Sequence, residues 1–125
     1  MTVLDTPRVT PCWCRYLSDK AHSLGQLLHD GGYATYFAGK WNLGDGAERS
    51  PGAKGWDRYI SLEQTGADNY EAKVYAPLNM EAVWWEDGKR AQLPKDFFST
   101  RHYVDKMIQF IEDGTPMKAK WDGCR

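Results

Sequence analysis

Residues 31–44, which read GGYATYFAGKWNLG, decide the fold together with the segment that leads into them. Just upstream, Ser23 and Gln26 stand three residues apart, which is the spacing of a capping box at the start of a helix. Three leucines then share one apolar stripe at helical spacing: Leu24, Leu27 and Leu28. Because a glycine pair at residues 31–32 ends this pattern, the sequence predicts a short helix that leads directly into the stretch.

After the glycine pair, residues 33–38 are rich in aromatic and small side chains, which predicts a buried strand. Gly39 and Gly44 then bracket a tight loop that carries Lys40 and Asn42. Residues 45–55 contain Gly and Pro among polar side chains and are expected to form a longer loop.

The middle of the chain predicts one more strand and a hairpin. Residues 56–60 read WDRYI and resemble a short strand, whereas residues 61–81 show no clear pattern and are expected to be rich in loops. Residues 83–86 and 89–93 flank Asp-Gly, a pair that suits both positive-φ positions of a type I′ turn. Of Trp84 and Trp85 in this hairpin, we expect one side chain in the core and the other exposed or at an interface.

A second helix is predicted to start near Ser99 or Thr100 and to end before Gly114, with Pro116 preventing continuation. Its apolar residues are expected to share one face: Tyr103, Val104, Met107, Ile108 and Ile111. The fold class is therefore α/β, with α+β as the alternative, in which two amphipathic helices pack on a small mixed sheet. Residues 1–22 are expected to form an arm, residues 23–114 the folded segment and residues 115–125 a tail.

Composition excludes several classes of function. A chain of 125 residues forms one small domain at most, and its formal net charge of −1 gives no electrostatic reason to bind nucleic acid or an anionic membrane. No apolar run approaches the ~18 residues of a membrane-spanning helix, and the N-terminus lacks the apolar core of a signal peptide. The compartment is not indicated.

Cysteine and histidine residues show no metal-ligand spacing. The odd number of cysteines, at Cys12, Cys14 and Cys124, argues against a closed disulfide framework and favours reduced, incidental thiols. Three histidines are expected at the surface: His22, His29 and His102. No metal ligand or cofactor-binding residue is predicted.

Residues 23–44 resemble the type I sulfatases, the arylsulfatases of the alkaline-phosphatase-like superfamily, whose signature runs roughly T-L-A-E-x-L-K-x-A-G-Y-x-T-x-x-x-G-K-W-H-L-G. Residues 55–59 are similar to the family's G-F-D-x-F, and residues 85–111 to a later hairpin and helix in the same order. The resemblance covers about three quarters of the chain. Since type I sulfatases are several times longer, it implies a segment of their catalytic domain, whose parent reaction is sulfuric ester hydrolysis.

The resemblance also implies roles for two residues. Family members use formylglycine, made from the cysteine of C-x-P-S-R, together with Ca²⁺, a sulfate-contacting lysine and a proton-transferring histidine. Lys40 matches that lysine and is expected to be an inherited sulfate contact, although it could simply close a strand end. Asn42 occupies the histidine position, and its neutral amide cannot act as a base near pH 7. C-x-P-S-R and the Asp-Asp metal pair have no counterpart, so no cofactor is expected in this chain.

Three hypotheses follow about what the chain does. It is a sulfatase-like protein, inactive as an isolated chain; or a non-catalytic module that binds sulfate, a sulfated small molecule or another anion; or a structural, oligomerising fragment. A homodimer is expected, because the strand at 33–38 would have an unpaired edge and six Trp are many for so short a chain to bury.

Overall fold

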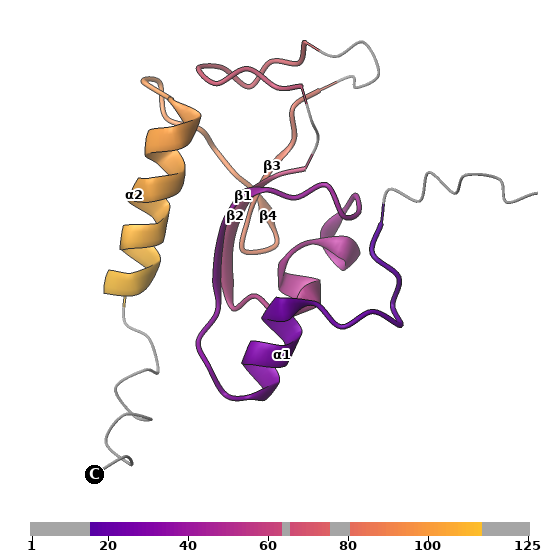
Figure 1. The fold of residues 1–125 in the computed structure, drawn as a ribbon. Coiled ribbons are helices and arrows are strands. Elements are labelled where there is room, and N and C mark those ends of the chain that lie inside the picture. The colour runs from indigo at the N-terminus through magenta and orange to yellow at the C-terminus, as the bar shows by residue number, and fades with distance from the viewer. Residues whose placement is uncertain (1–15, 64–65, 76–80, 114–125) are drawn as a thin grey trace, which may run out of the picture.

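The computed structural model describes residues 16–63, 66–75 and 81–113, and in them helices pack against one small sheet (Figure 1). In chain order the elements are α1 (Leu24–Asp30), β1 (Tyr36–Lys40), the 3-10 turns η1 (Ala47–Arg49) and η2 (Gly52–Lys54), β2 (Arg58–Leu62), β3 (Trp84–Glu86), β4 (Lys89–Arg90) and α2 (Ser99–Glu112). Figure 1 shows α2 standing beside the sheet and α1 near one end of it. The α/β class with a mixed sheet is confirmed.

The sheet has the order β1-β2-β3-β4. β1 and β2 are parallel, with Tyr36 paired to Arg58 and Lys40 paired to Leu62, whereas the β2–β3 and β3–β4 pairs are antiparallel. Within the described residues β1 therefore lies at an edge of the sheet. Because parallel strands end at the same edge, the residues that follow Lys40 and Leu62 are brought together.

The first helix begins where the sequence predicts, but two of the three leucines in its apolar stripe are exposed. The Ser23 side chain accepts a hydrogen bond from the Gln26 amide at 3.0 Å, as an N-cap should. Leu24 and Leu27 are 64% and 58% exposed. The helix instead contacts the molecule through Gly25, where an added Cβ would lie 2.7 Å from the Trp56 ring. A close backbone approach at Gly25 thus helps to hold α1 against the described part of the chain, while Leu28 is the only half-buried member of the predicted stripe.

The first strand starts three residues later than the sequence predicts. The Tyr33 amide donates to the Leu28 carbonyl at 2.9 Å, so residues 31–33 form the turn that closes α1. The Thr35 amide donates to the carboxylate of Asp57 at 2.9 Å instead of to a neighbouring strand. Pairing with β2 therefore begins only at Tyr36.

The hairpin is confirmed, with shorter strands than predicted. Asp87 and Gly88 have φ of 45° and 82°, as a type I′ turn requires. The Asp87 carboxylate also accepts from the Tyr59 amide at 2.8 Å and from Arg58 Nε at 2.7 Å, which fastens the turn to β2. Long-range contacts thus add to the local preference of the Asp-Gly pair.

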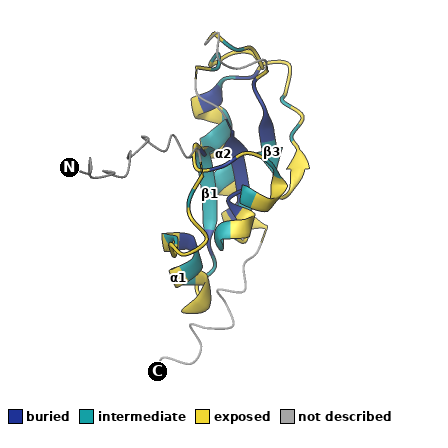
Figure 2. Ribbon diagram, turned by 90° about the vertical axis from the view of Figure 1, so that its right-hand side faces the viewer, coloured by how far each residue is buried: buried dark blue, intermediate teal, exposed yellow. Residues whose placement is uncertain are grey.

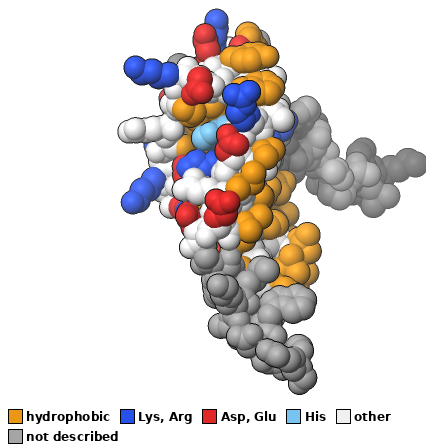
Figure 3. All heavy atoms as spheres, turned by 90° about the vertical axis from the view of Figure 1, so that its left-hand side faces the viewer, with side chains coloured by type: hydrophobic (Ala, Val, Ile, Leu, Met, Phe, Trp, Pro, Cys, Tyr) orange, Lys and Arg blue, Asp and Glu red, His pale blue; other side chains and the backbone are white. Residues whose placement is uncertain are grey.

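The second helix has the predicted start, but its predicted apolar face is only partly buried: Tyr103 packs against the core, whereas three other members of that face are exposed. Val104, Ile108 and Ile111 are 53%, 47% and 58% exposed, whereas Phe110, which was left out of the predicted face, is 1% exposed. Phe110 packs beside Tyr36, with ring centroids 6.3 Å apart. Figure 3 views the molecule from the side on which α2 lies and shows a band of hydrophobic side chains on that surface. The helix is therefore apolar on two sides, and the sheet covers only one.

The core lies where β2, β3 and α2 meet, and Figure 2 shows buried residues gathered in these inner strands. Six buried side chains form it: Ile60, Leu62, Ala82, Trp84, Phe97 and Phe110. Trp84 is 3% exposed and meets Phe97 edge to face at 5.1 Å, whereas Trp85 is only partly buried. This division between the two tryptophans agrees with the alternation expected along a strand.

Neither described helix is long and apolar enough to cross a membrane. Most of the predicted arm at residues 1–22 and all of the predicted tail at residues 115–125 lie outside the described residues. The three domain boundaries therefore stay predictions.

Candidate functional site

The two candidate residues lie where the parallel strands end. Lys40 is the last residue of β1, and the Trp41 amide continues the strand pairing by donating to the Leu62 carbonyl at 2.8 Å. Lys40 and Asn42 are both exposed, while Trp41 between them is 5% exposed. The chain therefore leaves the sheet with one buried aromatic side chain flanked by two accessible polar ones.

Trp41 anchors this loop. Its indole Nε1 donates to the Arg49 carbonyl at 2.8 Å, and its ring meets Phe37 edge to face at 5.3 Å. The Leu43 carbonyl accepts from the Leu17 amide at 2.7 Å. The Trp41 indole is buried and its N–H group has a hydrogen-bond partner, and both contacts restrain the backbone on either side of it. The neighbouring Lys40 and Asn42 therefore lie on a restrained loop.

Sequence reasoning missed a third residue of this region, Glu63. It directly follows β2 and is 7% exposed, although it carries a carboxylate. One carboxylate oxygen accepts from the Gly46 amide at 2.7 Å, and the other accepts from the Trp85 indole. The only signal in the sequence is an acidic residue directly after an apolar strand, within a segment that shows no periodicity.

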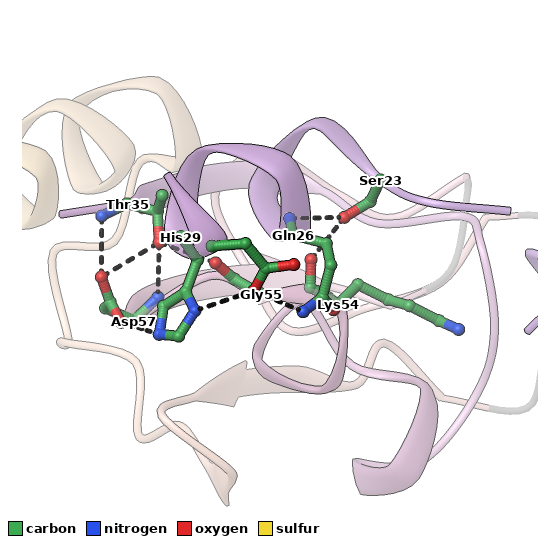
Figure 4. A network of polar contacts seen from close by, with 8 residues as sticks. Ser23, Gln26, His29, Thr35, Lys54, Gly55 and Asp57 are labelled. Carbon is green, nitrogen blue, oxygen red and sulfur yellow. Dashed lines mark hydrogen bonds and ion pairs between the residues drawn. The ribbon is translucent and has the colours of Figure 1, made fainter. Parts of the chain in front are cut away.

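A second polar cluster lies at the opposite, amino-terminal ends of β1 and β2 (Figure 4). The Asp57 carboxylate accepts from the Thr35 amide and, at 3.1 Å, from its hydroxyl, and lies 3.4 Å from His29 Nε2. The Thr35 hydroxyl has one proton, which it shares between that carboxylate and the Gly55 carbonyl, the nearer acceptor at 2.7 Å. These contacts join the end of α1 to the starts of two strands. They satisfy buried backbone groups, which is a structural role.

Of the three histidines predicted at the surface, His22 and His29 are exposed and His102 is not. The His102 ring lies against Phe97 and Trp84, at centroid distances of 5.4 and 6.4 Å, and its Nε2 is buried with no hydrogen-bond partner among the described residues.

Burial lowers the pKa of His102, and the nearby charge of Lys106 lowers it further. The carboxylates of Glu86 and Asp105 oppose that shift. The prediction failed because it considered only the polar neighbours in sequence.

Among the described residues, no group of three or more His, Cys, Asp or Glu side chains is placed to hold a metal ion. The three cysteines lie outside the described residues: Cys12, Cys14 and Cys124. Calcium and formylglycine stay properties that the resemblance alone implies.

The fold and site define an α/β segment in which an exposed lysine is the last residue of the edge strand of a parallel pair. Known sulfatases are similar to it. An arylsulfatase of Klebsiella aerogenes is 28% identical over 100 residues, which covers 77% of this chain and 21% of that protein. An uncharacterized sulfatase of Schizosaccharomyces pombe is 27% identical over 108 residues, which covers 78% of this chain and 19% of that protein. No protein family profile matches the chain.

These two similarities confirm the resemblance. The chain is a sulfatase-like protein, and it corresponds to a segment of a sulfatase. It spans about a fifth of the length of the two relatives.

Proposed function

We propose that this sulfatase-like chain binds sulfate or a small sulfated molecule through Lys40 and Asn42, and that alone it does not hydrolyse sulfate esters. The observation that supports the proposal is the placement of both side chains, exposed, on a loop that the buried Trp41 anchors at the carboxyl end of the parallel strands. The similarity to two sulfatases supports sulfate as the anion to test.

The chemistry of the two side chains suits binding more than turnover. A lysine ammonium supplies a positive charge and three N–H donors, and an asparagine amide adds two neutral donors. Sulfate oxygens accept such bonds, and bonds that involve an ion are the stronger ones. Asn42, unlike a histidine, cannot take up or release a proton near pH 7. A bound sulfate ester would therefore be held without the proton transfer that its cleavage needs.

Calorimetric titration with sodium sulfate and with a monosulfated sugar tests the binding step. Lys40→Ala should weaken binding severalfold or abolish it, because the cationic donor is lost. Lys89→Ala is the matched control, since Lys89 is also exposed but lies in β4, next to the hairpin turn that is fastened to the start of β2. Unchanged affinity in Lys40→Ala, or no heat of binding in the wild-type chain at millimolar sulfate, would refute the proposal.

An activated aryl sulfate tests the absence of turnover. The purified chain should not release the phenol above the background rate, with or without added calcium. Calcium-dependent turnover that is lost in Lys40→Ala would contradict this half of the proposal and would show that the chain holds a complete catalytic site.

The second candidate function is self-association through α2, and the observation that favours it is the exposed stripe of Val104, Ile108 and Ile111. Arg101 in the first turn of α2 and Glu112 in the last turn are also exposed. In an antiparallel pair of α2 helices related by a twofold axis, each arginine would face the partner's glutamate beside the apolar seam. The occupant we propose for this face is therefore a second copy of the chain.

Light scattering over a tenfold dilution from micromolar concentrations tests this association. Wild-type chain should change from dimer to monomer, and Ile108→Glu should be monomeric throughout, because a buried unpaired charge opposes pairing. Leu27→Glu, on the exposed side of α1, is the control and should behave as wild type. A wild-type monomer at every concentration, or equal loss in both variants, would exclude the α2 interface.

A further inference from the structure

We infer that Glu63 is a positioning residue for the loop that carries Lys40 and Asn42, an inference that rests on the proposed sulfate-binding function. Glu63 lies 23 residues after Lys40 in the sequence, yet its carboxylate reaches the same loop at Gly46. It would not touch the sulfate. Its role is to hold the backbone of residues 41–46 so that the binding groups are ordered before the ligand arrives.

The contacts of Glu63 connect three parts of the molecule. Its amide donates to the Val83 carbonyl at 2.9 Å, which extends the β2–β3 pairing by one residue. One carboxylate oxygen accepts from the Trp85 indole on β3, and the other from the Gly46 amide at 2.7 Å. The side chain therefore bridges the rigid sheet and the far end of the loop.

The loop backbone is shaped to make this contact. Gly46 has φ of 84°, in the left-handed region that glycine adopts most readily, and an added Cβ would meet nothing within 4 Å. Glycine is thus needed here for its backbone conformation and not for space. Gly46 also accepts from the Arg49 amide at 3.2 Å, which starts η1. Together with Trp41, the Glu63–Gly46 bond restrains both ends of the segment that contains Asn42.

Burial makes the arrangement sensitive to the carboxylate. A buried carboxylate is costly unless hydrogen bonds satisfy it, and each of the two Glu63 oxygens has one N–H donor. Replacing it by glutamine keeps one carbonyl acceptor but presents an NH₂ donor to the other N–H group. The chain must then give up one of the two bonds, and the exposed loop can move away more easily than the sheet tryptophan.

The effect of this restraint on the affinity for sulfate can be estimated. Ordering one backbone residue opposes binding by roughly the free energy of a tenfold change in affinity. Release of the loop at Gly46 should therefore weaken sulfate binding about three- to tenfold, with Lys40 itself unchanged.

The test compares Glu63→Gln with Trp85→Phe, which removes the indole donor but leaves the bond between Glu63 and Gly46. Hydrogen exchange of the Gly46 amide, measured by NMR without ligand, reports the loop restraint directly. Glu63→Gln should lose protection at Gly46 and bind sulfate about three- to tenfold more weakly, whereas Trp85→Phe should keep both within about twofold. Urea titrations of each variant identify conditions in which all chains are folded.

The outcomes separate the two proposals. Full protection of Gly46 in Glu63→Gln would overturn the positioning role, whatever the ligand does. Lost protection with unchanged sulfate affinity would also overturn it, because the restraint would then be structural only. If the wild-type chain binds no sulfate while Glu63→Gln releases Gly46, the proposed function fails, and the positioning role for sulfate binding fails with it although the contact itself is real.

Discussion

Truncation of two adjacent residues of α2, Phe110 and Ile111, should have very different effects on stability. Both are large and apolar, but Phe110 is 1% exposed and Ile111 is 58% exposed. The Phe110 ring lies beside Tyr36 and beneath the Arg58 guanidinium, whose central carbon is 4.6 Å from the ring centroid. Alanine at 110 removes contacts with β1 and β2 together, whereas alanine at 111 removes a side chain that is mostly in water.

The expected magnitudes follow from burial. Phe110→Ala should lower the free energy of unfolding by about 3–5 kcal/mol, the usual cost of emptying a phenylalanine site in a core. Ile111→Ala should cost about 1 kcal/mol or less, because less than half of the side chain is buried and alanine favours the helix by a few tenths of a kcal/mol. A loss of 3–5 kcal/mol is a large part of the stability of a small domain.

Urea unfolding, followed by tryptophan fluorescence and far-ultraviolet circular dichroism, measures both changes. The chain should be kept at low micromolar concentration so that association through α2 does not contribute. Phe110→Leu, which fills part of the site, should fall between wild type and Phe110→Ala and covers the case in which the alanine variant does not fold. Equal destabilisation by Phe110→Ala and Ile111→Ala would refute an orientation of α2 in which Phe110 faces the sheet and Ile111 faces solvent.

Three further predictions concern other sites. The free energy of unfolding should fall as the pH drops below about 6.5, because burial lowers the pKa of His102 and the unfolded chain then binds more protons. His102→Gln should reduce this slope. Gly55→Ala should destabilise more than Gly88→Ala: both have positive φ, but only at Gly55 would a Cβ lie 2.4 Å from the backbone of Gln26. Asp57→Ala should cost about 1–3 kcal/mol, because the buried Thr35 amide loses its partner.

Urea titrations at several pH values check all three, and each has a distinct contrary result. An unchanged pH slope in His102→Gln would mean that other groups cause the acid destabilisation. Equal stability of the two glycine variants would mean that α1 can move away from Gly55. A neutral Asp57→Ala would mean that water replaces the carboxylate at the start of β1.

The candidate site was only partly predictable from the sequence. Lys40 and Asn42 were found because they lie within one continuous motif of a few residues. Glu63 was not found, because its partners, Gly46 and Trp85, are 17 and 22 residues away and no local pattern connects them. A single acidic residue after a strand is ordinary in sequence. The burial of Glu63 depends on how β2 pairs with its neighbours, which the local sequence does not reveal.

Features that depend on neighbouring residues were determined by the sequence itself. Ser23 caps α1 and Asp87-Gly88 forms the hairpin turn because hydrogen bonds and backbone conformations within three or four residues decide both. The tertiary structure alone decided which side of α2 is buried, since Phe110 and Ile111 are equally apolar and only the position of β1 distinguishes them. It also decided that α1 docks through Gly25, because contact there requires two distant backbones to approach and leaves no periodic trace in the sequence.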